Sequence, residues 1–328
     1  LGRSTVPEHC MKRLTLAEFR ERSDEFAAAV AATPGVSHFC SGPLWQLAAH
    51  DFLHTIPDEK TRFILEDEGT WLLCVEREQA RVFFPFEAAW MFGCPLIGDP
   101  QRAVELLRAA RQWLPQPSGF CLGGILLDSP LHGALRELQP RARRYEEFPS
   151  TDCMILDLHD GVEGWLNRRS KKFRRTLRDA ETNEGIVFVA AGDAPPESLY
   201  YRLLEIQRRT YKWREGTDIF QMPDYAAFYQ SLLAGLHRRG DLRLLFAQRD
   251  GEDLAYIFGG VTGNTYRGLQ MSYVEEARTL GLGNRLQLEN LLRCSAEGIT
   301  RYDLGMPSPY KERWADRQEV NTGIFVIM

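Results

Sequence analysis

Apolar and polar residues are arranged along the chain in a pattern that predicts two successive α/β (α+β) units. In the first half, the pattern predicts helices at 14–32, 45–50, 103–113 and 131–139, and strands at 71–75, 81–86, 90–97, 119–127 and 151–158. In the second half, it predicts helices at 163–183, 196–211, 223–237 and 285–297, and strands at 186–190, 242–248, 254–260, 266–273, near 302 and at 323–328. Apolar residues three and four apart indicate the helices, and apolar runs between turn residues indicate the strands. The order of elements is similar in the two halves, so we expect a boundary between 157 and 164.

A turn with two glycines joins a predicted strand to a predicted helix. The seven residues from Arg278 to Asn284 read Arg-Thr-Leu-Gly-Leu-Gly-Asn and lie between strand 266–273 and helix 285–297. The first turn of a helix has free N–H groups at the positive end of the helix dipole, and glycine lets the backbone approach a phosphate. The turn therefore indicates an anion site that suits a pyrophosphate. The alternative is a tight connection without a ligand.

Two common nucleotide-binding motifs do not fit this turn. The dinucleotide fingerprint needs a third glycine, where this chain has Leu286. The P-loop needs lysine and serine or threonine, where this chain has Asn284 and Arg285. A dinucleotide site and a P-loop are therefore disfavoured.

Composition narrows the class of protein. The chain has 328 residues, 44% of them hydrophobic, and a formal net charge of −5, which indicates a globular protein that would need a local patch to contact nucleic acid. Its seven cysteines are scattered without C-x-x-C spacing, as expected of free thiols in a reducing, cytoplasmic location. No apolar run has the length of a membrane span. His50 and His54 form an H-x-x-x-H pair without a third ligand, and no G-x-S-x-G occurs, so we expect no metal and no hydrolase site.

The motifs that follow the turn resemble a known superfamily. Helix 285–297 is followed by Gly298, by Tyr302-Asp303-Leu304-Gly305 and then by Tyr310-Lys-Glu-Arg-Trp314, while a basic helix lies at 165–177. Together with Arg-x-x-Gly-x-Gly, these segments look like the GNAT acyltransferases. The subgroup they resemble includes the CelD-type proteins of cellulose biosynthesis and is similar to the Fem aminoacyl transferases. The resemblance covers about half of the chain, from about residue 160 to the end.

This resemblance implies a fold of two tandem GNAT-like domains, each a mostly antiparallel mixed sheet flanked by helices. Residues 1–158 have no counterpart of the turn at 278–283, so we expect a degenerate N-terminal domain that walls the acceptor site. Residues 159–328 are then the acyltransferase domain that contains the acyl-CoA site.

The resemblance also implies acyl-CoA as co-substrate, with its diphosphate held by backbone amides of the turn. The strand ending at Tyr273 and the strand through Tyr302 would splay apart, and residues 270–272 would face the thioester. The residues implied in holding the donor are Arg278, Leu280, Gly281, Leu282, Gly283, Asn284, Met271, Ser272 and Lys311.

Two residues are implied in catalysis. Tyr310 stands where many GNAT proteins have a tyrosine that protonates the leaving thiolate, and Asp303 would be a base or an anchor for the acceptor ammonium. The alternative for Tyr310 is packing beside Trp314 on one helical face. The alternative for Asp303 is capping, or pairing with a neighbouring arginine such as Arg301 or Arg313.

Aromatic and basic residues supply the remaining candidates. By the resemblance, Tyr211 and Trp213 lie in a loop over the active site and bind the acceptor together with Gln270 and Tyr273; the alternative for Trp213 is a core position. The densest charge lies in helix 163–183, and a solvated helix face is the ordinary interpretation. The alternative is contact with a phosphorylated partner, an acidic peptide or tRNA. The charged residues of this helix are Arg168, Arg169, Lys171, Lys172, Arg174, Arg175 and Arg178.

The functional hypothesis is an N-acyltransferase that moves an acyl group from acyl-CoA to an amine of a small molecule, sugar or peptide. One alternative is a Fem-like transferase that uses aminoacyl-tRNA; the basic helix favours it, and the acidic net charge and the glycine turn disfavour it. Another alternative is a non-catalytic accessory protein of exopolysaccharide biosynthesis.

Overall fold

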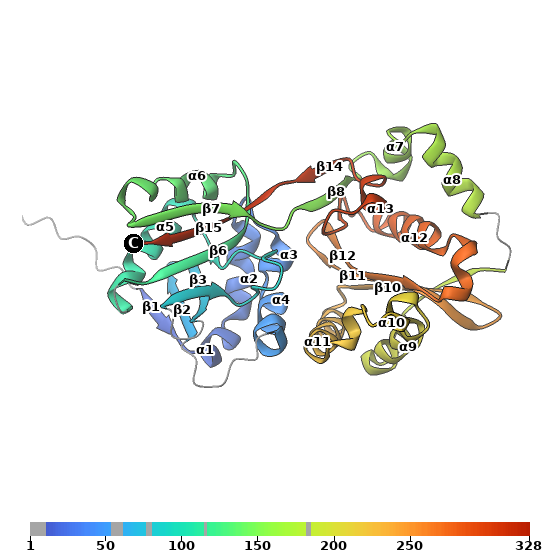
Figure 1. Ribbon diagram of the computed structural model, residues 1–328, viewed down its shortest axis with the longest axis horizontal. Helices are drawn as coiled ribbons and strands as arrows, with labels where there is room; N and C mark the ends of the chain where they lie inside the picture. The colour runs from blue at the N-terminus through green and yellow to red at the C-terminus, as the bar shows by residue number, and fades with distance from the viewer. Residues whose placement is uncertain (1–10, 54–61, 77–80, 115–116, 182–184) are drawn as a thin grey trace, which may run out of the picture. The chain divides into compact units, whose positions relative to one another are not determined.

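The described part of the chain forms two units, each built on its own sheet (Figure 1). The computed structural model describes residues 11–53, 62–76, 81–114, 117–181 and 185–328. The first unit comprises the chain up to Thr151 together with Val320–Met328, and the second comprises Asp152–Glu319. This division differs from the predicted ranges 1–158 and 159–328 because the chain enters the second sheet before residue 158 and returns to the first sheet at its end.

The first unit is an eight-stranded sheet, counted over the described residues, with helices packed against it. Its strand order is β1-β2-β3-β4-β6-β15-β7, with β5 beside β3. The strands are β1 (Lys12–Leu14), β2 (Arg62–Asp67), β3 (Thr70–Glu76), β4 (Val82–Pro85), β5 (Leu96–Ile97), β6 (Gly119–Leu126), β7 (Arg144–Pro149) and β15 (Asn321–Ile327). The helices are α1 (Leu16–Glu21), α2 (Ser23–Ala32), α3 (His38–Ser41), α4 (Pro43–Ala48), α5 (Pro100–Ala109) and α6 (Pro130–Arg136).

Local sequence signals explain several of these elements. Thr15 and Glu18 form a capping box that begins α1, as their spacing predicts. The predicted helix 14–32 is nevertheless two helices, because the chain bends at Arg22 between α1 and α2. The strands predicted at 71–75 and 81–86 are β3 and β4, and they pair antiparallel. β2, which pairs with β3 across the turn at Gly69, was not predicted.

The strand predicted at 90–97 is wrong over most of its length, since only Leu96–Ile97 pairs as a strand. The preceding residues are held in an irregular path by the buried carboxylate of Glu87. Its Oε1 accepts hydrogen bonds from the N–H groups of Trp90 at 2.7 Å and Met91 at 3.2 Å, and its Oε2 accepts one from Phe92 at 2.9 Å. Because these amides are satisfied by a side chain, they are not available to a strand ladder.

We expect Glu87→Gln to lower the free energy of unfolding by about 1–2 kcal/mol, because one carboxylate acceptor becomes an amide donor facing buried N–H groups. Glu87 is fully buried. Urea denaturation measures the change. Glu105→Gln, an exposed position on α5, is the matched control and should change stability by less than about 0.5 kcal/mol. Equal effects of the two variants would contradict a structural role for the Glu87 carboxylate.

The last strand of the chain lies in the sheet of the first unit. β15 pairs antiparallel with β6 on one side and with β7 on the other. Its alternate residues Thr322, Ile324 and Val326 are buried, so the strand completes the core of this sheet. The expectation that residues 323–328 belong to the second domain is therefore wrong, whereas their prediction as a strand is confirmed.

The second unit has a seven-stranded sheet within the described ranges, with strand order β14-β8-β13-β12-β11-β10-β9. In Figure 1, α9, α10 and α11 lie on one face of β10–β12, and α7, α8, α12 and α13 lie on the other. The strands are β8 (Cys153–Asp157), β9 (Val187–Ala190), β10 (Leu242–Arg249), β11 (Glu252–Thr262), β12 (Thr265–Tyr273), β13 (Arg301–Asp303) and β14 (Arg317–Glu319). The helices are α7 (Gly161–Asn167), α8 (Lys171–Glu181), α9 (Pro196–Arg208), α10 (Tyr211–Arg214), α11 (Pro223–Arg239), α12 (Leu282–Ala296) and α13 (Pro309–Glu312).

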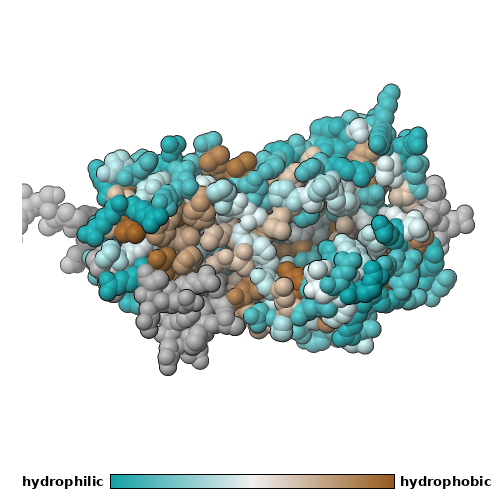
Figure 2. Space-filling view, viewed as in Figure 1, coloured by the Kyte–Doolittle hydropathy of each residue, from teal (hydrophilic) through white to brown (hydrophobic). Residues whose placement is uncertain are grey.

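The predicted basic helix 163–183 is interrupted. It consists of α7 and α8, and Ser170 begins α8 by accepting a hydrogen bond from the N–H of Phe173 at 3.2 Å. The predicted positions 182 and 183 lie outside the described residues. Hydrophilic residues cover most of the visible face of this unit in Figure 2. None of the helices in the described ranges is long and apolar enough to cross a membrane.

Candidate functional site

The glycine turn has the geometry of an anion site. β12 ends at Tyr273, a 3₁₀ turn spans Glu275–Leu280, and Gly281 adopts a φ of 64°, which favours glycine. α12 then begins at Leu282, earlier than the predicted position 285. The N–H groups of Leu282 and Gly283 have no hydrogen-bond partner among the described residues, while those of Asn284 and Arg285 donate to the carbonyl of Gly281. Two backbone donors are therefore available at the positive end of α12.

Side chains from β12 and α13 lie beside this turn. A Cβ at Gly283 would lie 3.7 Å from Cε of Met271 and 4.0 Å from Cε1 of Tyr273. The hydroxyl of Tyr310 donates a hydrogen bond to the carbonyl of Gly283 at 3.1 Å. Burial raises the pKa of Tyr310, so the phenol stays protonated at neutral pH. The structure thus brings together four of the predicted site residues.

The other predicted residues of β12 face the opposite side of the sheet. The amide of Gln270 donates to the hydroxyl of Tyr229 on α11 at 2.9 Å, and Ser272 lies directly opposite the buried Tyr256 of β11 in the strand register. Strand alternation explains the division, because residues 270 and 272 share one face while 271 and 273 share the other. Ser272 therefore does not lie with Met271 beside the turn.

β12 and β13 separate beside the turn. Their parallel pairing runs only from Thr265 opposite Arg301 to Arg267 opposite Asp303. Beyond Arg267, β12 continues to Tyr273 with β11 as its only strand neighbour in the described part of the chain. A register shift opposite Phe258 and Gly259 adds one extra residue, Leu269, to β12. The backbone of this stretch therefore has one side open to a ligand.

A buried ion pair lies where the two strands separate. Nη1 of Arg267 is 2.7 Å from Oδ2 of Asp303, and the two side chains are only 3% and 5% exposed. The same nitrogen lies 3.3 Å from Sγ of Cys153, and Oδ1 of Asp303 accepts the N–H of Gly305 at 2.7 Å. Asp303 thus pairs with Arg267 rather than with Arg301 or Arg313. The sequence offers one hint, a single arginine within strand 266–273, but it does not indicate which residue is the partner.

Lys311 lies close to this ion pair. Burial lowers the pKa of Lys311 to about 8, and the positive charge of Arg267 adds to the decrease. The positive charge of Lys212 in α10 also lowers the pKa of Lys311, so the 209–214 segment lies near the site. Lys311 is therefore a half-buried cation that loses its proton near physiological pH.

The 209–214 segment is a surface element. Tyr211 is 47% exposed and Trp213 is half-buried, so the alternative that Trp213 is ordinary core does not hold. Arg214 forms an ion pair with Glu275, which ties α10 to the 3₁₀ turn that precedes Gly281. Arg278 and Leu280 belong to that same 3₁₀ turn, and Arg278 is exposed.

Part of the basic segment has a structural role. Arg168 pairs with Asp160 and Asp316, and Arg169 pairs with Asp316 and donates to the carbonyls of Trp314 and Ala315. The ring of Trp314 stacks on that of Trp165 in α7 with 5.4 Å between ring centres, and its centre lies 6.0 Å from that of the Tyr310 ring. The expected packing of Tyr310 beside Trp314 is therefore present. Within the described ranges, no group of three histidine, cysteine or acidic residues could hold a metal ion; His54 lies outside them.

Part of the second unit matches a known protein family. Residues 167–312 match the family described as the acetyltransferase (GNAT) domain. This segment of the chain is a GNAT domain. No curated protein matches it in sequence. The GNAT match lies within the second unit, which contains the glycine turn and the separated strands.

Solved structures extend the likeness to the whole chain. The crystal structure of FemX has 12% identity and a TM-score of 0.68, covering 97% of both chains. A protein of unknown function from Bacteroides thetaiotaomicron has 12% identity and a TM-score of 0.65, covering 98% of this chain and 100% of that one. L-PGS from Bacillus licheniformis has 15% identity and a TM-score of 0.56, covering 92% and 91%. At these identities the likeness concerns the fold alone, which here is two mixed sheets, each flanked by helices.

The family match supports a general activity. A domain described as an acetyltransferase (GNAT) domain transfers acyl groups, so residues 167–312 form an acyltransferase domain in general.

Proposed function

We propose that this protein is an N-acyltransferase that transfers an acyl group from acyl-CoA to an amine of a small molecule, sugar or peptide. The observation that carries the proposal is the pair of free N–H groups at Leu282 and Gly283, beside the opening between β12 and β13. A diphosphate at these amides would lead the pantetheine arm along the open side of β12. A backbone N–H of that strand could then donate to the thioester carbonyl.

Three side chains have proposed roles in the reaction. Tyr310 donates a proton to the leaving thiolate, because its phenol is protonated at neutral pH and lies at the glycine turn, residues 278–284, which we call the donor turn. Lys311 attracts the anionic donor as a cation. Asp303 was predicted as a base or an ammonium anchor. Because its oxygens already accept hydrogen bonds from Arg267 and Gly305, the role proposed here is to fix Arg267 beside Lys311. The exposed rim and backbone of the donor turn come from Arg278, Leu280, Gly281 and Asn284. The turn is lined by Met271 and Tyr273. Tyr211, Trp213 and Gln270 remain proposed acceptor contacts.

Thermal stability with ligands tests the proposal. Free CoA, acetyl-CoA and a long-chain acyl-CoA should each raise the melting temperature, since a ligand at about 100 times its Kd adds about 2.7 kcal/mol. The acyl-CoA with the greatest effect identifies the donor. Absence of any shift at millimolar concentration would exclude the CoA proposal. An accessory protein would bind without turnover of any amine, so release of free CoA thiol in the presence of amines is the second measurement.

The second candidate is a transferase that uses aminoacyl-tRNA. The fold likeness to FemX and the exposed cations of α8 favour it. A short RNA hairpin ending in CCA is the discriminating ligand: stabilisation by this RNA, without stabilisation by CoA, would replace the acyl-CoA proposal.

The affinity for CoA should depend on pH through Lys311. Protonated Lys311 attracts the donor, and its pKa in the free protein is about 8, so Kd should rise as pH increases from 7 to 9.5. Lys311→Arg should remove this dependence because arginine keeps its charge. Lys311→Met should bind weakly at every pH. Isothermal titration calorimetry measures all three proteins, and an unchanged pH profile in Lys311→Met would assign the dependence to another group.

A further inference from the structure

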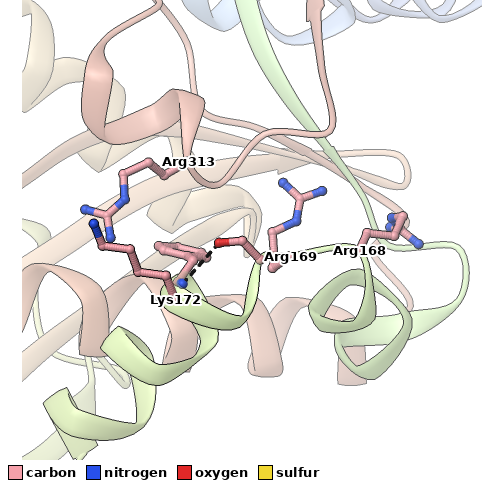
Figure 3. A pocket seen from close by; sticks show the side chains of 6 residues that line it. Arg168, Arg169, Lys172 and Arg313 are labelled. Atoms are coloured by element: carbon pink, nitrogen blue, oxygen red, sulfur yellow. Dashed lines mark hydrogen bonds between the residues drawn. The ribbon is translucent and has the colours of Figure 1, made fainter.

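A basic pocket lies between the start of α8 and the end of α13. It has a volume of about 520 Å³ and is lined by Arg168, Arg169, Ser170, Lys172, Phe173 and Arg313 (Figure 3). Both of its walls belong to the second unit. Four of its lining residues are cations and none is an acid, so the pocket suits an anion.

The four cations differ in what they already bind. Arg168 and Arg169 are held by Asp160, Asp316 and backbone carbonyls, so they frame the pocket. Lys172 and Arg313 are exposed and have no ion-pair partner among the described residues. The guanidinium of Arg313 lies 4.9 Å from the centre of the Phe173 ring, a contact that holds it at the pocket. Lys172 and Arg313 are therefore available to bind a ligand.

A hydroxyl completes the set of donors. Oγ of Ser170 accepts a hydrogen bond from the N–H of Phe173, which leaves the hydroxyl proton available to a ligand. An ammonium, a guanidinium and a hydroxyl together offer donors from several directions. Such a set matches a terminal phosphate with three exposed oxygens better than a single-point anion.

The pocket lies beside the donor turn. Arg313 follows Tyr310 by three residues, so the two side chains start about 5–6 Å apart, and the Tyr310 hydroxyl touches Gly283. At the other end of α8, Ala180 approaches Gly281, where an added Cβ would lie 3.2 Å from Cβ of Ala180. Lys172 is eight residues before Ala180, or about 12 Å along the helix. In coenzyme A six bonds separate the 3′-phosphorus from the nearer phosphorus of the diphosphate, a span of at most about 7 Å, and the flexible four-carbon stem of Lys172 covers the remaining distance.

We propose that Lys172, Arg313 and Ser170 bind the 3′-phosphate of the CoA donor, as a subsite separate from the amides that hold the diphosphate. This inference rests on the proposed function and names the part of the donor that α8 recognises. The interrupted basic segment then has two roles. Arg168 and Arg169 stabilise the corner between α7 and α8, and Lys172 binds the 3′-phosphate of the donor.

Comparison of CoA with 3′-dephospho-CoA tests the subsite. By isothermal titration calorimetry, the wild-type protein should bind CoA about tenfold more tightly than 3′-dephospho-CoA. The double variant Lys172→Gln/Arg313→Gln should bind CoA about tenfold more weakly and 3′-dephospho-CoA as the wild type does. Lys171→Gln removes the same charge from the adjacent exposed position, which does not line the pocket, and should behave as the wild type.

The other outcomes overturn the inference. Equal wild-type affinities for the two ligands would show that the 3′-phosphate is not bound, while CoA binding itself would still stand. An equal loss for both ligands in the double variant would place these residues at the diphosphate. Binding of a CCA-ended RNA hairpin that depends on Lys172 and Arg313, and that adenosine 3′,5′-bisphosphate does not displace, would assign the pocket to RNA. Absence of binding by either CoA ligand would reject the proposed function as well.

Discussion

Asp303→Ala should lower the free energy of unfolding by about 3–5 kcal/mol, because it leaves the guanidinium of Arg267 buried without its carboxylate. Both side chains are almost fully buried, so water cannot replace the lost partner. The N–H of Gly305 loses its acceptor in the same variant. Urea denaturation followed by circular dichroism measures the change.

A double variant separates the ion pair from simple loss of packing. Arg267→Met/Asp303→Ala removes both charges, so it should be more stable than Asp303→Ala alone. If the loss of stability in the double variant, relative to the wild type, equals the sum of the losses in Asp303→Ala and Arg267→Met, the two side chains are not energetically coupled. Asp303→Asn, which keeps the shape of the side chain, should lie between the wild type and Asp303→Ala.

Gly283→Trp should abolish the stabilisation by CoA while the protein remains folded. Gly283 is the second residue of α12, and a large side chain there would fill the space toward Met271 and Tyr273 that the donor needs. Stabilisation at a CoA concentration of about 100 times the wild-type Kd should fall from about 2.7 to below about 0.5 kcal/mol. Melting curves with and without CoA measure the difference.

Gly283→Ala is the control for this substitution. The nearest atom to the added Cβ would be Cε of Met271 at 3.7 Å, an ordinary contact, so the variant should fold normally and keep most of its response to CoA. Undiminished stabilisation of Gly283→Trp by CoA would show that the diphosphate lies elsewhere.

Sequence patterns predicted those features of the fold that depend on neighbouring residues. Three features follow from local backbone preferences. They are the capping box at Thr15 and Glu18, the Asp250-Gly251 turn between the strands predicted at 242–248 and 254–260, and the strand–turn–helix around Gly281. The two α/β units and the GNAT domain of the second unit were predicted through the resemblance and are confirmed.

Features that depend on distant pairing were not predicted. β7 was missed because its Arg-Tyr-Glu-Glu-Phe-Pro sequence is rich in charge, and only its pairing with β15 makes it a strand. The Arg267–Asp303 pair depends on the parallel register of β12 and β13, which no local pattern encodes. Strand alternation could have separated Gln270 and Ser272 from Met271 and Tyr273, but the extra residue at Leu269 obscures which pair faces the donor turn.

The position of β15 affects the order in which the protein can fold during synthesis. The residues of the second unit, 152–319, are contiguous, so this unit can close as soon as they leave the ribosome. The first unit is made earlier, yet β6 and β7 have to wait for residues 321–327 before they gain the strand that joins them. Until then, β6 exposes an apolar edge to other nascent chains. The half of the protein that is translated first is therefore the half that is completed last.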